Sequence, residues 1–406
     1  MPLSEKHDLR SGDPAWDEGD YSVPLSTPAP RYCDVAIIGA GVMGAVLAER
    51  LTADGHRVAL LDRRPPAHGS TAASTAQIMW AMDLPMRELA ARLGEAEARR
   101  CWQRVYKATR AFAARMDNIG IPCHRTDRPT LYLEGTTLDA RGLAEEVAFH
   151  TRAGLPTDLL TADAIATRFN IAPRAGLVST GGFELDPVKL TLGLLNRALG
   201  RGATVCWPCD VVALETEKNA VVLALENGGR ISARHAIFAG GYERSPLLLP
   251  PAFELLSTFV MATPPRTAPL WREHAMIWEA SDPYLYIRTS RDGRIIVGGE
   301  DIDAFDPARR DRETSERTSI IAHKAAALLG LDAPLSVDRR WSAMFGSSPD
   351  GLPAIGPAVN LPGVWLSAGF GGNGIAFAAL ASEILTSALS GRLDPDAACF
   401  DPYRFS

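Results

Sequence analysis

The feature that most constrains the fold of this chain is a run of spaced glycines that begins at residue 39. The apolar residues 35–38 predict a short buried parallel strand, and Gly39, Gly41 and Gly44 then follow in the G-x-G-x-x-G order. In this order the first glycine permits a tight turn, the second lets the backbone approach a pyrophosphate, and the third lets the next helix lie close to the strand. The pattern therefore predicts a dinucleotide-binding site.

The residues that follow complete a strand–helix–strand unit. Residues 42–54 predict a helix whose first amides, at Val42 and Met43, point toward the phosphates. Residues 58–61 predict the second strand, and Asp62 ends it at close to the spacing of about 20 residues expected for a carboxylate that binds ribose hydroxyls. A strand, a helix, a second strand and an acid in this order make the motif far more specific than three glycines alone.

Charge and composition narrow the classes of protein. The 406 residues carry a net charge of −6 without a basic cluster, which argues against nucleic acid and anionic membranes as partners. We find no apolar run of the ~18–20 residues that a membrane span needs, and no basic start followed by an apolar core that would indicate a signal peptide. Six cysteines in so long a chain do not indicate a disulfide framework. We therefore expect a cytoplasmic globular protein.

Cys206 and Cys209 form a C-x-x-C pattern with two interpretations. The pair is typical of a redox site or half of a zinc site. However, the sequence contains no second C-x-x-C, and the pair lies between two predicted strands instead of at the start of a helix. We favour a turn with two unlinked thiols, and we expect no metal.

The rest of the chain alternates between predicted helices and strands. Residues 1–33 are polar and rich in proline, and we expect an extended arm anchored by Trp16 or Tyr21. Helical spacing covers residues 86–118, 140–154, 188–200, 313–329 and 375–389, whereas residues 255–300 alternate like antiparallel strands. A turn at residues 227–229 predicts a hairpin in between.

Two further segments favour FAD over NAD as the dinucleotide. Residues 69–76 form a small, hydroxyl-rich loop in which Ser70, Thr71, Ser74 and Thr75 can donate hydrogen bonds to a flat ring. Residues 369–374 form a second glycine-rich turn, and the helix after it can stabilise negative charge on a reduced ring.

In this order, the pieces resemble the D-amino-acid oxidase/glycine oxidase superfamily of FAD-dependent oxidoreductases over residues 34–390. The motifs that carry the resemblance are G-S-T-A-A-S-T-A at 69–76, the R-x-x-x-D-G-R-I-I-V-G-G-E-D-like hairpin at 288–301, D-G-L-P-x-I-G at 350–356 and G-F-G-G-N-G-I at 369–375. The resemblance implies an α/β protein with a Rossmann-like FAD-binding domain that has a mixed sheet, and an inserted substrate domain with an antiparallel sheet. The implied ranges are 34–80, 155–250 and 340–395 for the first domain, 81–154 and 251–339 for the second, and 396–406 for a tail.

The resemblance also implies where FAD binds. The matching positions are Gly39, Gly41, Val42, Met43, Gly44, Asp62, Arg63, Ser70, Thr71, Ser74, Thr75, Val211, Gly240, Gly372, Asn373, Gly374 and Ile375. Relatives with covalent flavin use a cysteine at the place of Ala343 or a histidine at the place of Ala72 or Ala73. We therefore expect noncovalent FAD.

By the same resemblance, the reaction removes a hydride from a carbon that bears an amine and passes it to flavin N5, and the resulting imine hydrolyses. Positioning carries most of this chemistry, so we nominate no side-chain base. The electron acceptor is oxygen or another molecule. An FAD-dependent 2-hydroxy-acid dehydrogenase and a noncatalytic or partner-dependent flavoprotein subunit stay open as alternatives.

The substrate residues depart from the family pattern. Phe345 and Gly372 stand where glycine-oxidase-like relatives carry the arginines that hold a substrate carboxylate. Arg288 is the candidate replacement, although it can equally pair with Asp292 or Glu300. The aromatic and apolar residues that can form a wall over the flavin, or belong to the core, are Trp80, Met82, Tyr286 and Phe345.

Overall fold

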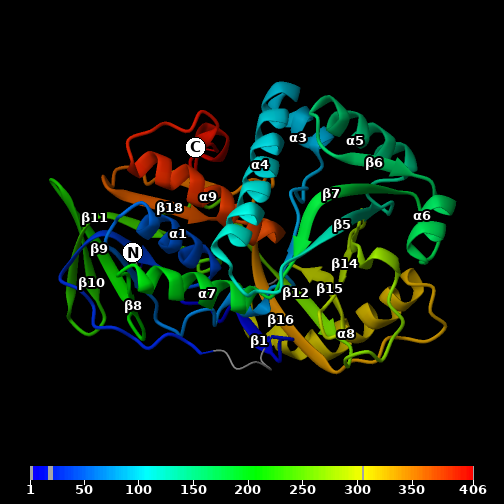
Figure 1. Ribbon diagram of the computed structural model, residues 1–406, viewed down its shortest axis with the longest axis horizontal. Coiled ribbons are helices and arrows are strands. Elements are labelled where there is room, and N and C mark those ends of the chain that lie inside the picture. Colours follow the sequence, from blue (N-terminus) through cyan, green and yellow to red (C-terminus); the bar gives the residue numbers. More distant parts are fainter. Residues whose placement is uncertain (1–2, 17–21, 304–305, 406) are drawn as a thin grey trace.

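The computed structural model describes residues 3–16, 22–303 and 306–405, and Tyr21 lies outside them. Within this part of the chain, two sheets lie side by side, each with its own helices (Figure 1). The long helix α4 (Glu95–Ile119) stands between the two halves in this view. The fold class that the sequence predicts, an α/β protein with a mixed sheet and a largely antiparallel one, is confirmed.

The first sheet has eight strands in the order β17-β18-β11-β2-β3-β8, and β10 and β9 continue from β11. These strands are β2 (Tyr32–Ile38), β3 (Val58–Leu61), β8 (Thr204–Cys206), β9 (Val211–Glu217), β10 (Ala220–Leu225), β11 (Arg230–Phe238), β17 (Ala354–Pro357) and β18 (Val364–Ala368). The central strands β18, β11, β2, β3 and β8 run parallel. Three helices cover the sheet, namely α1 (Val42–Ala53), α7 (Pro187–Gly200) and α9 (Gly374–Leu389), and α1 packs against each of the other two. Parallel strands buried on both faces explain the continuous apolar runs.

The second sheet has ten strands in the order β1-β16-β12-β15-β14-β13-β5-β7-β4, and β6 pairs with β7. These strands are β1 (Arg10–Gly12), β4 (Gln77–Ile78), β5 (Thr126–Leu133), β6 (Thr157–Leu160), β7 (Gly176–Glu184), β12 (Glu254–Ala262), β13 (Met276–Glu279), β14 (Leu285–Thr289), β15 (Ile295–Ile302) and β16 (Arg339–Ser347). All pairs are antiparallel except β13 with β5. The helices around this sheet are α3 (Met86–Leu93), α5 (Ala140–Arg152), α6 (Ala162–Phe169) and α8 (Pro307–Leu328).

The sheets do not coincide with the residue ranges inferred from the sequence. Strand β7, within the expected range 155–250, and strand β16, within 340–395, both pair in the second sheet. The alternation of a strand shows that one face is buried, but it does not show which sheet supplies its neighbours. The chain therefore crosses between the two sheets more often than a two-piece insertion requires.

Three expected elements also have different limits. The helix expected over 86–118 is two helices, because Gly94 has a φ of 89° between α3 and α4. The loop at 69–76 contains one helical turn, α2 (Ser70–Ala73). Helix α8 begins at Pro307 instead of near 313, and Asp306 caps it by accepting a hydrogen bond from Ala308 N. Short 3₁₀ turns are η1 (Arg272–His274), η2 (Gly371–Asn373) and η3 (Ala397–Phe400).

The N-terminal arm is anchored at several points. Strand β1 pairs with β16 at the edge of the second sheet. Trp16 Nε1 donates to the carbonyl of Ser74 at 2.8 Å, so the anchor expected at Trp16 is confirmed. Leu3 and Leu9 are also buried. The arm therefore packs along the first loops of the site.

One segment contradicts the expectation that the chain contains no apolar run of membrane-spanning length. Residues Gly371–Leu389 are long and apolar enough by length and composition. In the structure, 67% of this window is buried, and α9 packs against α1 and α4. Its apolar character fits a core helix that is covered on most sides.

Candidate functional site

One cleft runs from the glycine turn after β2 to the second sheet. Its lining joins the predicted cofactor loops to aromatic residues of β13 and β14, and the loop before α3 closes one side. The sequence-predicted residues that line it are Gly39, Gly41, Val42, Met43, Asp62, Arg63, Ser70, Thr71, Ser74, Thr75, Val211, Gly240, Tyr286, Phe345, Gly372, Asn373, Gly374 and Ile375. Gly44, Trp80 and Arg288 do not line it.

The three glycines of the first turn are required for different reasons. Gly39 has a φ of 118°, and a Cβ there would lie 2.3 Å from the carbonyl oxygen of Ala239. A Cβ at Gly44 would lie 2.0 Å from the carbonyl oxygen of Gly39. At Gly41, the nearest atom to such a Cβ is Thr71 Oγ1 at 3.1 Å, on the lining of the cleft. The protein itself excludes side chains at Gly39 and Gly44, whereas the space beside Gly41 belongs mainly to the cleft.

Asp62 holds the turn and faces the cleft. Its carboxylate accepts hydrogen bonds from Ala40 N at 2.8 Å and from Arg64 N at 2.9 Å. Burial raises the pKa of the Asp62 carboxyl above its usual range, against these two hydrogen bonds. A carboxylate oxygen accepts more than one bond, so Asp62 keeps capacity for ribose hydroxyls. The neighbouring guanidinium groups of Arg63 and Arg64 both pair with Glu243.

Several buried polar atoms around α2 have no partner among the described residues. Thr71 Oγ1 is satisfied, because it accepts from Val42 N at 3.0 Å. By contrast, Ser70 Oγ and both amide atoms of Gln77 are buried without a hydrogen bond. Both residues line the cleft. Buried polar groups in native proteins are normally paired, so these atoms fit a bound polar ligand such as the flavin dinucleotide. Gln77 did not emerge from the sequence analysis.

Asp83 links the two ends of the cleft and was also missed. Its carboxylate accepts hydrogen bonds from Gly372 N at 2.8 Å and from Asn373 Nδ2 at 3.3 Å, at the start of α9. Its side chain is exposed to the cleft, yet the position lies deep in the protein, and burial raises the pKa of this carboxyl. The available sequence signal was that Asp83 is the only charged residue between His68 and Arg87.

The far end of the cleft is aromatic. Tyr284, Tyr286 and Trp278 line it, together with Phe345. The Tyr286 hydroxyl lies 3.2 Å from Thr258 Oγ1, and burial raises the pKa of this phenol well above its usual range. Trp278 stacks on Tyr132 with ring centroids 3.9 Å apart. These contacts fix the rings as a rigid wall.

Asp301 lies behind this wall. Burial raises the pKa of the Asp301 carboxyl to about 6, against contacts with Thr258 and Tyr284. Its Oδ1 atom is buried and has no hydrogen-bond partner among the described residues. A second acid therefore lies behind the aromatic wall, outside the cleft lining.

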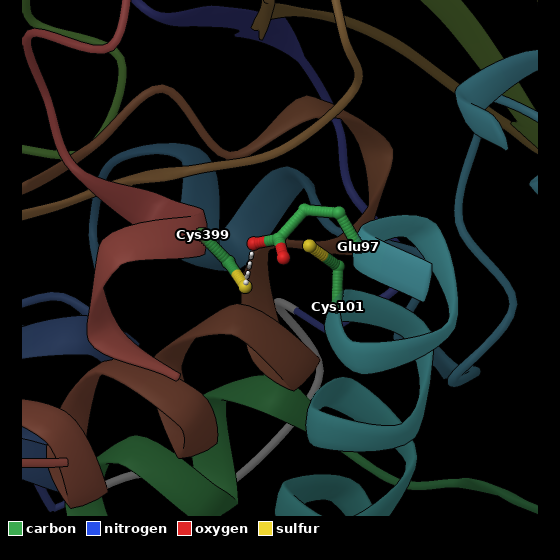
Figure 2. A group of neighbouring side chains, drawn as sticks. All are labelled: Glu97, Cys101 and Cys399. Atoms are coloured by element: carbon green, nitrogen blue, oxygen red, sulfur yellow. Dashed lines mark hydrogen bonds between the residues drawn. The ribbon is translucent and has the colours of Figure 1, made fainter. Parts of the chain in front are cut away.

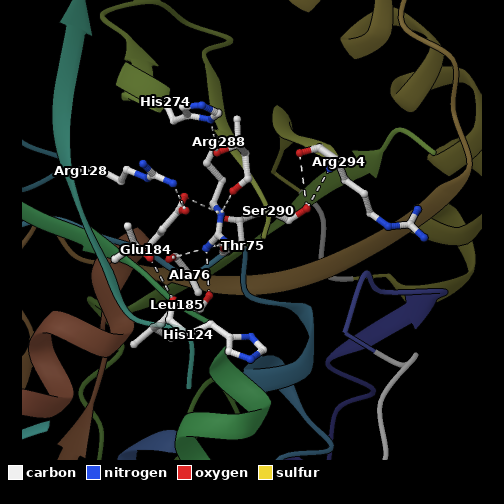
Figure 3. A network of polar contacts seen from close by, with 12 residues as sticks. Thr75, Ala76, His124, Arg128, Glu184, Leu185, His274, Arg288, Ser290 and Arg294 are labelled. Atoms are coloured by element: carbon white, nitrogen blue, oxygen red, sulfur yellow. Dashed lines mark hydrogen bonds and ion pairs between the residues drawn. The ribbon is translucent and has the colours of Figure 1, made fainter. Parts of the chain in front are cut away.

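The assignment of Arg288 as a substrate anchor is corrected. Its guanidinium is buried and donates from Nη1 to the carbonyls of Thr75, Ala76 and Leu185 at 2.9–3.0 Å (Figure 3). Glu184 Oε2 lies 3.6 Å from Nε. Arg288 ties the hydroxyl-rich loop to β7, and its expected partners Asp292 and Glu300 are not the ones that hold it.

Trp80 is likewise a core residue instead of part of the wall. Its indole is 1% exposed and donates from Nε1 to the carbonyl of Thr180 at 2.8 Å. It packs edge-on against Trp102 and Tyr106. Met82 is also buried outside the cleft lining. The wall over the predicted flavin site thus keeps Tyr286 and Phe345 and gains Tyr284 and Trp278.

Of the six cysteines, Cys209 lines the dinucleotide end of the cleft, and the other five lie outside its lining. Cys206 and Cys209 are free thiols in the turn between β8 and β9, as the turn interpretation predicts. A second group joins Glu97 and Cys101 of α4 to Cys399 of η3 (Figure 2). Cys399 Sγ donates to Glu97 Oε1 at 3.1 Å, and the hydrogen bond with Cys399 together with burial raises the pKa of Cys101. A raised pKa keeps the Cys101 thiol protonated, whereas a metal ion binds the thiolate form. We therefore interpret this group as a hydrogen-bonded contact between thiols and a carboxylate.

Comparison with known proteins identifies the family to which the chain belongs. Residues 34–388 match the FAD dependent oxidoreductase family, DAO, and the chain belongs to this family. It is therefore an FAD-dependent oxidoreductase, and the family resemblance and the cofactor predicted from the sequence are confirmed.

Individual relatives agree with this assignment. The chain is 26% identical over 432 residues to a D-amino-acid oxidase of Bradyrhizobium diazoefficiens, covering 93% of this chain and 100% of the relative. It is similar in structure to glycine oxidase from Geobacillus kaustophilus, with a TM-score of 0.74, 20% identity, and coverage of 92% of this chain and 99% of that one. L-Proline dehydrogenase from P. horikoshii gives a TM-score of 0.75 at 20% identity, with coverage of 93% and 98%. These structures share the fold.

Proposed function

We propose that the protein oxidises the C–N bond of an amine or amino acid by hydride transfer to flavin N5, after which the imine hydrolyses. The observation that carries the proposal is the single cleft, in which the dinucleotide turn, the start of α9 and the aromatic wall face one space. The named relatives, a D-amino-acid oxidase, a glycine oxidase and an L-proline dehydrogenase, support this class of substrate. When bound, FAD supplies the hydride acceptor.

The chain's own residues bind and orient. The turn at Gly39 to Gly44 and the first amides of α1 would hold the pyrophosphate, and Asp62 would hold the ribose. The rings of Tyr284, Tyr286 and Trp278 would exclude water and fix the substrate carbon over the cofactor. We nominate no catalytic base, because positioning of the C–H bond carries most of this chemistry.

The same geometry leads us to propose noncovalent FAD. Ala343 and Ala73 line the cleft, and neither offers a nucleophile. We expect a yellow protein from which acid or heat releases all the flavin. Flavin that stays with the denatured polypeptide would contradict this part of the proposal and would leave the reaction class untouched.

The reaction class is tested by anaerobic bleaching of the bound flavin. Matched panels of amines, amino acids and 2-hydroxy acids are mixed with the holoenzyme, and loss of the visible flavin absorbance is followed. We expect bleaching by members of the amine or amino-acid panels. Bleaching by hydroxy acids alone would show a 2-hydroxy-acid dehydrogenase, and a flavin that no panel reduces but dithionite does would favour a noncatalytic subunit.

A further inference from the structure

We propose that the substrate enters the cleft as a cationic amine without a free carboxylate, and that Asp83 is its counter-ion there. The ammonium gives up one proton to solvent before hydride transfer, because only the lone pair of the neutral amine can form the carbon–nitrogen double bond of the imine. The proposal rests on the proposed function, because it concerns the same cleft. It adds a specificity-determining residue and narrows the substrate from amino acids and amines to positively charged amines.

The first argument is the distribution of charge along the cleft. The basic residues among its described lining are Arg63, Arg64 and His68, and all three lie at the dinucleotide end. Arg63 and Arg64 are paired with Glu243. Around the aromatic wall, the described lining contains no arginine, lysine or histidine. The residues that the structure does not describe contain none of these three types either.

A substrate carboxylate would therefore find no cationic partner at the aromatic end. Phe345, which lines this end, has an uncharged side chain. The Arg288 guanidinium donates its hydrogen bonds to the carbonyls of Thr75, Ala76 and Leu185 instead. An unpaired buried carboxylate costs several kcal/mol. This end of the cleft rejects free amino acids.

The second argument is the position of Asp83. Its carboxylate is held by Gly372 N and Asn373 Nδ2, so its orientation is fixed, and each oxygen retains capacity to accept another hydrogen bond. The side chain faces the cleft, and no basic residue pairs with it among the described ion pairs. Asp301 lies outside the cleft lining but close enough to Asp83 for the charge of Asp83 to raise its proton affinity. A cationic ligand would offset this repulsion.

The third argument is the wall itself. Tyr284 and Tyr286 lie with ring centroids 5.8 Å apart, and Trp278 is held by stacking on Tyr132. The faces of such rings attract ammonium groups. The Asp83 carboxylate and an aromatic wall, without a basic residue in the described lining at this end, form a site for a cation.

The experiment uses three non-reactive probes of nearly the same shape and different charge. They are choline, 3,3-dimethylbutan-1-ol and 3,3-dimethylbutanoate, which are cationic, neutral and anionic. Each is titrated anaerobically into the holoenzyme, and the perturbation of the visible flavin spectrum gives its Kd. We expect choline to bind at least about tenfold more tightly than the alcohol, and the anion to bind most weakly. A tenfold ratio needs only a part of the attraction between two unit charges about 4 Å apart in a protein. Equal binding of choline and the alcohol, or tighter binding of the anion, would overturn the proposal.

Variants assign the effect to Asp83. Asp83→Asn keeps an oxygen for Gly372 N but removes the charge, and we expect the preference for choline over the alcohol to fall about tenfold. Asp83→Glu keeps the charge and should keep a preference. If Asp83→Asn does not retain flavin, the wild-type probe series still decides the charge preference. An undiminished preference in a flavin-loaded Asp83→Asn protein would contradict the role of Asp83.

The outcomes separate this inference from the proposed function. Choline preference without bleaching by any amine would support the cation site and contradict the proposed reaction. Bleaching by free amino acids together with a preference for the anionic probe would support the reaction and contradict the cation site.

Discussion

The two ends of the cleft are built differently. The cofactor end consists of backbone turns and helix starts from short, continuous segments, such as Gly39 to Gly44 and the residues after Leu61. The substrate end is made of side chains from separate strands, among them Thr258 of β12, Trp278 of β13, Tyr286 of β14 and Phe345 of β16. The first arrangement is tied to a sequence pattern, and the second can vary one side chain at a time. A change of one side chain can therefore alter the substrate end without altering the backbone turns of the cofactor end.

The largest expected effect tests whether backbone geometry alone makes the cofactor end. Gly44→Val should prevent stable folding or FAD binding, because its Cβ would lie 2.0 Å from a carbonyl oxygen of the same turn. Gly41→Val should nearly retain the thermal unfolding midpoint of the apoprotein, because its Cβ would meet only the side chain of Thr71, at 3.1 Å. It should lose FAD binding, because the valine side chain would occupy the space of the pyrophosphate. Thermal unfolding and FAD titration of both variants check the contrast. Equal stability losses in the two apoproteins would show that Gly41 is structural too.

The next prediction tests whether Arg288 binds a ligand at the substrate end of the cleft or only stabilises the fold. Arg288→Ala would leave three carbonyls without their donor and Glu184 with Arg128 as its remaining arginine, and we expect a loss of about 3–5 kcal/mol in the free energy of unfolding. Urea denaturation of the apoprotein measures it, with Arg288→Lys as a control that keeps the charge. Because Arg288 lies outside the cleft lining, acidic and neutral ligands should be affected alike. A selective loss of acidic ligands with unchanged stability would restore Arg288 as a substrate anchor.

A smaller effect is expected at Asp62, the main side chain of the cofactor end. Asp62→Ala removes a charged acceptor from the ribose and should weaken FAD binding by roughly 1.5–3 kcal/mol for each hydrogen bond lost. The FAD Kd, measured by quenching of flavin fluorescence, reports the change. Asp62→Asn is the matched control, since it keeps an acceptor for Ala40 N or Arg64 N. An unchanged Kd in both variants would exclude Asp62 as the ribose ligand.

The smallest effect sharpens the description of the substrate end. Asp301 has a pKa of about 6 in the folded protein, against about 3.9 in an unfolded chain. Its raised pKa means that the folded state is relatively more stable at low pH, and that this advantage is lost as the pH rises through about 6. The groups that act on it are Thr258, Tyr284, Asp83 and Asp282.

Asp301→Asn, which resembles the protonated form, should therefore gain stability over the wild type as the pH rises. We expect the difference in unfolding free energy between variant and wild type to grow by about 1 kcal/mol from pH 5 to pH 8. Urea denaturation of the two apoproteins at each pH measures this. A difference that does not change with pH would show that Asp301 titrates at an ordinary pKa.

The sequence predicted the cofactor end because its requirements are local. A tight turn needs a glycine at Gly39, and a close helix needs one at Gly44, so the residue types themselves carry the geometry. The fold class followed from the same unit and from the alternation of the later strands. The sheet that each strand joins did not follow, because pairing partners such as β1 and β16 lie far apart in the chain.

The substrate end could be predicted only in part for a related reason. Tyr286 and Arg288 are two residues apart on β14, so the alternation places both on one face. It does not show that Tyr286 reaches the cleft while Arg288 lies under the loop at Thr75. Asp83 lies in a loop without any periodicity, and only its isolated charge distinguished it.

The N-terminal arm joins segments that lie far apart in the sequence, at the cofactor end of the cleft. Leu3 and Leu9 line that end, and the carbonyl of Leu9 accepts a hydrogen bond from Met344 N at 2.9 Å. Ser11 and Ser342, which meet at the same edge, are 331 residues apart in the sequence. The arm can dock only once β16, which lies far along the chain, is in place. The cofactor end of the cleft therefore gains Leu3 and Leu9 as lining only when two distant segments of the chain have met.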